Sequence, residues 1–154
     1  MDPKVERLKT PEECRAFIEN ARLRGFDELA KQAYRRIIAL RTQGYGPKND
    51  IERQCVEAIY AYEEVISARS SRRITASKTW QAAKQHGIFV AVGKAAGRPE
   101  DPEIYPMLVS LGLEQFAFEN VVVRHPDEFG FEALQQSRAR VAKRGGEANP
   151  YQAA

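Results

Sequence analysis

Apolar residues recur at three- and four-residue spacing along most of the chain, which is the period of an amphipathic α-helix. In the first such stretch Thr10 can cap a helix, Pro11 stands at its first position and Gly25 ends it. The second stretch ends at Gly44, and its apolar face is Leu29, Ala33, Ile37 and Leu40. The short connection between the two predicts an antiparallel helical hairpin.

The same reading continues to the C-terminal end. Asp50 can cap a third, longer helix, and after the break "SSRRI" either Thr75 or Ser77 can cap a shorter one that ends at Gly87. Residues 88–92 fit a strand or a helix, and the alanines that follow them favour a helix. Two short helices divided at Gly112 and a last amphipathic helix, "FEALQQSRARVAKR", complete the pattern.

These elements predict an all-α fold, a compact bundle of seven to eight helices in one domain over residues 1–144, with a flexible tail at 145–154. The apolar positions of "EQFAFENVVV" are too many for one stripe, so we expect this helix to be buried on all sides, with a partner-binding face as the alternative. Cys14 and Cys55 each fall on an apolar helix face, which predicts reduced, buried thiols.

The composition bears on where the protein is located in the cell. The sequence has no apolar run near the roughly 18 residues that a membrane span needs, and its first residues lack the pattern of a secretory leader. We therefore expect a cytoplasmic protein with no membrane contact. The two cysteines are too few for a disulfide framework.

Charge is unevenly distributed along the chain. Residues 65–99 contain seven Lys or Arg and no Asp or Glu, whereas the rest of the chain has 17 basic and 21 acidic residues. Solubility alone does not require the exclusion of acids, so this segregation favours an anionic partner. A solvated surface that binds no nucleic acid remains the alternative.

The acid-free run also carries the hydroxyl and amide side chains that contact phosphates, sugars and base edges. We therefore predict a nucleic-acid-binding site, for DNA rather than RNA, within residues 69–86. Trp80 is expected to hold the helix against the core. Further basic residues can extend the basic surface if they fold alongside it, namely Arg35, Arg36, Arg41, Arg138, Arg140, Lys143 and Arg144. The predicted site residues are Arg69, Arg72, Arg73, Thr75, Ser77, Lys78, Thr79, Gln81, Lys84 and Gln85.

In "TWQAAKQHGIFVAVGKAA", Ala83 stands four residues before Gly87 and Ile88 follows it. This stretch resembles the first helix and turn of a helix-turn-helix. Its second helix departs from that motif because "FVAVGKAAG" is nearly all apolar and would read a DNA groove poorly. The resemblance is therefore partial, and it implies that the first of the two helices and the preceding loop would contact DNA.

Catalysis finds little support in the residues. His86 and His125 lie far apart, no metal-ligand spacing is present, and no cofactor motif occurs. We expect His125 to sit at a helix end, and the adjacent Glu63 and Glu64 to lie on a solvated helix end. We therefore predict a non-catalytic protein without cofactor or metal. The alternative function is a helical protein-interaction module or accessory subunit, and the oligomeric state stays open.

Overall fold

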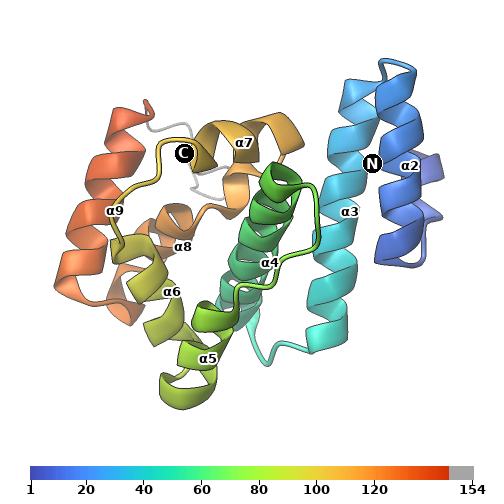
Figure 1. Cartoon of the computed structure of the whole chain (residues 1–154). Coiled ribbons are helices and arrows are strands. Elements are labelled where there is room, and N and C mark those ends of the chain that lie inside the picture. Colours follow the sequence, from blue (N-terminus) through green and yellow to red (C-terminus); the bar gives the residue numbers. More distant parts are fainter. Residues whose placement is uncertain (146–154) are drawn as a thin grey trace.

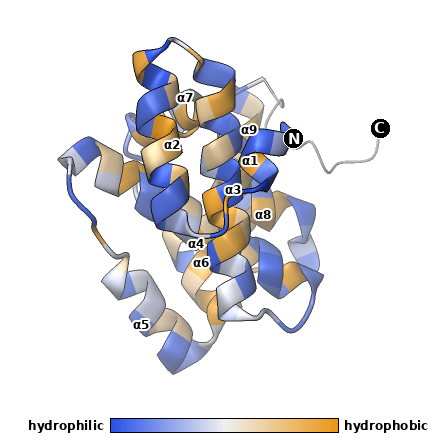
Figure 2. Cartoon of the chain, turned by 90° about the vertical axis from the view of Figure 1, so that its right-hand side faces the viewer, coloured by the Kyte–Doolittle hydropathy of each residue, from blue (hydrophilic) through white to orange (hydrophobic). Residues whose placement is uncertain are grey.

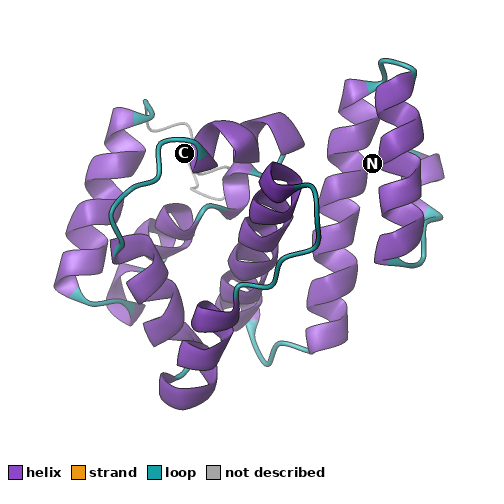
Figure 3. Cartoon of the chain, viewed as in Figure 1, coloured by secondary structure: helices purple, strands orange, loops and turns teal. Residues whose placement is uncertain are grey.

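The computed structural model describes residues 1–145, which form helices and turns without a strand in that range (Figure 3). This confirms the all-α prediction, and eight of the nine α-helices in the described residues are seven residues or longer. The predicted tail, apart from Gly145, lies outside the described residues. The α-helices are α1 (Pro3–Glu6), α2 (Pro11–Leu23), α3 (Asp27–Tyr45), α4 (Asp50–Ser70), α5 (Ser77–His86), α6 (Ile88–Gly97), α7 (Ile104–Leu111), α8 (Phe118–Arg124) and α9 (Phe131–Lys143), with 3₁₀ turns η1 (Glu114–Phe116) and η2 (Pro126–Glu128).

The N-terminal hairpin is present as predicted, with α2 packed along α3 at one side of the molecule (Figure 1). Thr10 caps α2 by accepting a hydrogen bond of 3.1 Å from the backbone N–H of Glu13, and Pro11 follows at the first helical position. Gly25 makes the turn with a φ of 76°, a left-handed value that residues with a Cβ seldom adopt. Local sequence chemistry therefore sets both ends of α2.

The central helix of the bundle is α4, which contacts α3, α6, α7 and α8. One apolar cluster joins its residues Ala61 and Val65 to α1, α2, α3 and α7. A second joins Cys55 and Ile59, on the same helix, to α6 and α8. Both cysteines are unpaired and buried, which confirms the thiol prediction. Because both sides of α4 are covered, polar side chains in its middle are enclosed as well.

The later helices agree with the predicted ones, and the structure decides the two alternatives that the sequence left open for them. Residues 88–97 are helical, and α8 is buried through Phe118, Val121 and Val122, so the "EQFAFENVVV" stretch is core rather than a partner face. No helix within residues 1–145 is long and apolar enough to cross a membrane. Hydrophilic and hydrophobic residues instead alternate around the helices, as Figure 2 shows for α2.

Three helix ends differ from the prediction. Asn49, not Asp50, caps α4 through a 2.9 Å hydrogen bond from the backbone N–H of Glu52. Helix α3 runs through Gly44 to Tyr45, and the left-handed residue that ends it is Gly46. Neither of the hydroxyl residues expected to cap α5 does so, because Ala76 holds the cap position and its N–H donates to a buried carboxylate of α4.

Candidate nucleic-acid interface

The predicted site spans the end of α4, the loop 71–76 and α5, which lies at the lower edge of the molecule in Figure 1. Helix α5 packs chiefly against α6, and much of its surface faces outward. Its polar residues Lys78, Gln81, Lys84 and Gln85 are all exposed. Helix α5 therefore has a packed face and a polar outer face.

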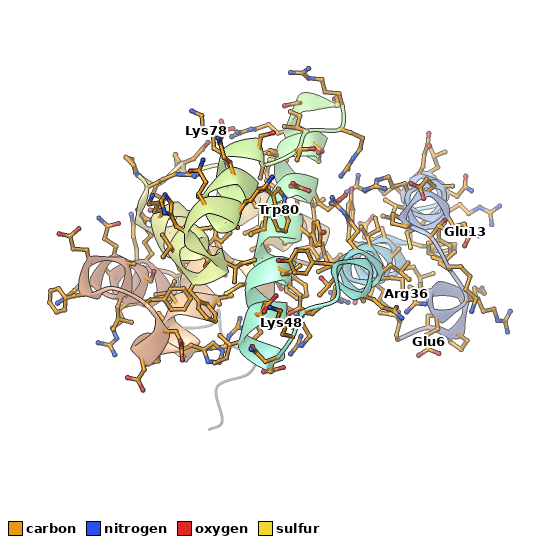
Figure 4. The ribbon with its side chains drawn as sticks, turned by 90° about the horizontal axis from the view of Figure 1, so that it is seen from below. Glu6, Glu13, Arg36, Lys48, Lys78 and Trp80 are labelled. Carbon is orange, nitrogen blue, oxygen red and sulfur yellow. The ribbon has the colours of Figure 1, made fainter. Side chains whose placement is uncertain are left out.

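Trp80 fixes α5 to the body of the protein, which confirms its expected role as an anchor. Its ring stacks on Tyr45 at a centroid distance of 5.8 Å and lies 5.2 Å from Tyr60 of α4. Its Nε1 donates a hydrogen bond of 2.7 Å to Oε2 of Glu63. In Figure 4 the indole lies between α5 and α4, while Lys78 projects from α5 away from α4.

Glu63 and Glu64 were expected at a solvated helix end, and this is wrong. Their relative exposures are 1% and 2%, because α4 is covered on both sides. Oε2 of Glu64 accepts hydrogen bonds from Arg15 at 3.0 Å, from Arg41 at 3.1 Å and from Arg73 at 2.8 Å. A buried carboxylate is tolerated when such partners satisfy it.

Glu63 completes this network. Its Oε1 accepts from Arg41 at 2.7 Å, and its Oε2 accepts both from the backbone N–H of Ala76 at 2.8 Å and from Trp80. The two carboxylates thus tie α2, α3, the loop 71–76 and α5 to α4. They are the buried groups that position the candidate site.

Two of the predicted phosphate-binding arginines are already engaged in ion pairs. Arg73 pairs with Glu64, and Arg69 pairs with Asp101 at 2.7 Å and with Glu103 at 3.6 Å. The pKa of the Asp101 carboxyl lies below its usual range, first because of its hydrogen bond from Arg69. Acids outside the acid-free run therefore neutralise part of it in space.

Thr79 does not lie on the surface either. It is 2% exposed, and its Oγ1 is 3.4 Å from Nη2 of Arg98. Thr79 lies in the first turn of α5 with its side chain toward the packed face, so its hydroxyl cannot contact a ligand on the outer face.

The remaining site residues are all exposed, two on the loop 71–76 and five on α5, and together they are hereafter the α5 face. Among the described residues, its three cations have no carboxylate at ion-pair distance. The residues of the α5 face are Arg72, Thr75, Ser77, Lys78, Gln81, Lys84 and Gln85.

Several of the further basic residues are engaged in other contacts and do not extend the α5 face. Arg41 is held by the buried carboxylates, and Arg36 donates to the backbone oxygen of Leu8. Near the C-terminal end, Arg140 and Arg144 pair with Glu119 at 3.2 Å each. These side chains stabilise contacts between helices.

The α5–α6 pair departs from a helix-turn-helix in two respects. Gly87 alone connects the two helices, with a φ of 94°, whereas the motif uses a turn of about three to four residues. Helix α6 buries Ala91, Val92, Ala95 and Ala96, as its apolar sequence led us to expect. Of the two helices, only α5 presents a polar outer face.

Within residues 1–145, no group of three or more His, Cys, Asp or Glu side chains could hold a metal ion. His125 holds the C-cap position of α8, as expected of a residue at a helix end, and its Nε2 lies 3.0 Å from Oε1 of Gln54.

Comparison of the chain with protein-family models, curated proteins and solved structures found no match. Function is therefore inferred from the geometry of the α5 face.

Proposed function

We propose that the protein binds nucleic acid, and DNA in particular, through the α5 face. One observation carries this: Arg72, Lys78 and Lys84 are exposed on the loop 71–76 and α5, and no carboxylate among the described residues neutralises them. Unpaired cations gathered on one surface form the electrostatic footprint of a phosphate-binding protein.

The spacing on α5 suits a helix lying along a groove. Lys78, Gln81 and Lys84 are three residues apart, so they share one side of the helix, and Gln85 lies next to them. The helix has ten residues, which corresponds to a length of about 15 Å. Lysines can contact phosphates, while a glutamine amide can pair with the edge of adenine.

The start of α5 adds donors to this surface. No side chain caps it: the N–H of Ser77 donates to the backbone oxygen of Thr75 at 2.8 Å, whereas the N–H groups of Lys78 and Thr79 have no acceptor among the described residues. Thr75 and Ser77 stand beside this end with exposed side chains. A helix N-terminus flanked by hydroxyls and by Arg72 favours a phosphate group.

DNA is preferred over RNA because of groove shape. The major groove of B-form DNA admits an α-helix, whereas the major groove of A-form RNA is too narrow and deep for one. A protruding helix with a polar outer face therefore fits duplex DNA better. The proposal assigns no catalytic role to these residues.

A protein-interaction module is the second candidate, and one observation favours it. Leu23 and Phe26, at the tip of the α2–α3 hairpin, are 82% and 51% exposed. Exposed apolar side chains mark contact surfaces on many proteins when several of them form one patch. Neither Leu23 nor Phe26 belongs to the α5 face, so variants of the two surfaces test the two functions independently.

The deciding experiment is fluorescence anisotropy with a labelled duplex of about 25 base pairs, titrated between about 50 and 300 mM salt. With three unpaired cations on the α5 face, we expect a slope of log K against log[salt] of about −3. Absence of binding at the lowest salt, or binding that is insensitive to salt, would overturn the proposal. Competition with duplex RNA then tests the preference for DNA.

A further inference from the structure

A second basic feature adjoins the α5 face at the loop 71–76 and shares Arg72 with it. It is a groove of about 560 Å³ between α2 and the C-terminal end of α4, hereafter the arginine groove. Its walls carry four arginines, Arg15 and Arg22 from α2 and Arg72 and Arg73 from the loop. The volume lies within the range of small-molecule sites.

The charge in the groove is not balanced by its own residues. Two carboxylates line it, those of Glu19 and Glu64, against the four arginines. Glu64 is already bound by Arg15 and Arg73. For Arg22 and Arg72, no carboxylate partner occurs among residues 1–145, which leaves two guanidinium groups available to a ligand.

The groove has further features of a binding site. Arg22 lies over the ring of Tyr34 at 5.2 Å from its centroid, which restrains its guanidinium at the groove wall. Nε of Arg15 is buried without an acceptor. Ser71 adopts a left-handed φ of 55°, unlike every other described residue except glycines, and this backbone turn leads directly into Arg72.

Apolar side chains stand beside the charged ones. Ile18, Leu23 and Ala68 line the same groove, and Leu23 is 82% exposed. A ligand that carries both an anionic group and a flat or apolar part can therefore use both kinds of surface. Inorganic anions would use only the arginines.

We infer that the arginine groove binds a phosphate monoester. Such a group carries a charge of nearly −2 at neutral pH and three acceptor oxygens, which matches the two unpaired guanidinium groups. The monoester belongs either to a free nucleotide or to the phosphorylated end of a nucleic-acid strand. Arg72 belongs to both surfaces, whereas Arg22 lines the groove and is not part of the α5 face, so variants of Arg22 test the groove separately from duplex binding.

The test compares AMP with adenosine, which lacks the phosphate, by isothermal titration calorimetry on the full chain. We expect AMP to bind and adenosine not to bind. Arg22→Gln should weaken AMP binding by about tenfold or more, because a charge-assisted contact is lost. Arg24→Gln is the matched control, since it removes an equal charge from the exposed end of α2 outside the groove, and it should change the affinity less than twofold.

Failure of AMP to bind at about 5 mM, or equal weakening by Arg22→Gln and Arg24→Gln, would overturn the inference. A second comparison identifies the source of the monoester. It measures the affinity for a short single strand with a 5′-phosphate and for the same strand with a 5′-hydroxyl. Tighter binding of the phosphorylated strand, lost in Arg22→Gln, identifies a strand end. AMP binding without this difference identifies a free nucleotide. Duplex binding should be unchanged in Arg22→Gln, so failure here is distinguishable from failure of the α5 face.

Discussion

The indole Nε1 of Trp80 donates a hydrogen bond of 2.7 Å to the carboxylate of Glu63, which is 1% exposed in the centre of the bundle. This bond joins the peripheral helix α5 to the central helix α4. Tyr45 and Tyr60 enclose the same indole. The orientation of the α5 face therefore depends on a buried charge that lies far from the surface itself.

Replacing Trp80 by phenylalanine should remove this bond while keeping a ring in the aromatic stack. We expect the free energy of unfolding to fall by about 2 kcal/mol, because a hydrogen bond to a charged group is lost. Urea denaturation followed by circular dichroism measures this, since Trp80 is the chain's single tryptophan and its fluorescence disappears in the variant.

Tyr45→Phe provides the matched control for Trp80→Phe. It also removes one polar group from the same stack, but Tyr45 is 43% exposed. Its free energy of unfolding should stay within about 0.5 kcal/mol of the original chain. Equal losses in the two variants would show that the bond to Glu63 contributes little.

The fold could be predicted from the sequence where local structure depends on residues close together in the chain. The capping of α2 by Thr10, the stop at Gly25 and the burial of α8 all follow from periodicity and turn chemistry. The predicted helix ends were wrong by one or two residues where another residue could take the same role. For example, Asn49 rather than Asp50 caps α4. Such competition depends on backbone angles that the pattern does not specify.

The candidate site was predictable only in part, because charge along a chain differs from charge in space. Residues 65–99 contain no acid, yet Arg69 and Arg73 find acids at Asp101 and Glu64. The burial of Glu63 and Glu64 depends on α4 being covered from two sides. A hint was present in the apolar residues on both sides of the pair in "AYEEVIS". The arginines that satisfy the pair come from separate elements, which no linear spacing reveals.

Lys84 should matter for duplex binding, since it is exposed and unpaired on the α5 face. Lys84→Gln is expected to weaken binding by about three- to tenfold and to reduce the salt slope by about 1, corresponding to one phosphate contact. Anisotropy titrations at several salt concentrations measure both quantities.

The matched control is Lys9→Gln, an exposed lysine in the connection between α1 and α2. Helix α2 lies on the far side of α3 from α5, as Figures 1 and 4 show. This variant should leave the affinity within twofold and the salt slope nearly unchanged. If both variants weaken binding equally, the binding reflects overall charge and not the α5 face.

Gly112 is expected to tolerate no side chain. Its φ is 75°, and a Cβ at this position would lie 2.6 Å from Cβ of Lys31, an atom fixed to the α3 backbone. Gly112→Ala should lower the free energy of unfolding by about 2–3 kcal/mol through backbone strain and this overlap. Gly44→Ala is the contrasting variant, because a Cβ there meets no atom within 4 Å and Gly44 lies inside α3.

For Gly44→Ala we expect a gain of about 0.5–1 kcal/mol, the difference in helix propensity between the two residues. Urea denaturation of both variants gives the comparison. A stable Gly112→Ala variant would show that the approach of Lys31 relaxes without cost.

His125 should make stability depend on pH. Burial of its ring, and then the charge of Arg124, hold the pKa of His125 below its usual value near 6.5. The unfolded chain therefore binds this proton more readily than the folded chain. As the pH falls from about 7.5 through 6.5, the free energy of unfolding should decrease, and this contribution should level off below the folded pKa.

His125→Gln removes this titration and keeps an amide that can reach Oε1 of Gln54, the partner of the imidazole at 3.0 Å. Denaturation of both chains at a series of pH values between about 7.5 and 5 isolates the contribution of His125 from those of the carboxylates. The original chain should lose more stability than the variant over this range. Parallel curves would mean that His125 binds its proton equally well in the folded and unfolded chains. A steeper loss in the variant would mean that the folded chain favours the charged ring, reversing the sign expected from its burial and from Arg124.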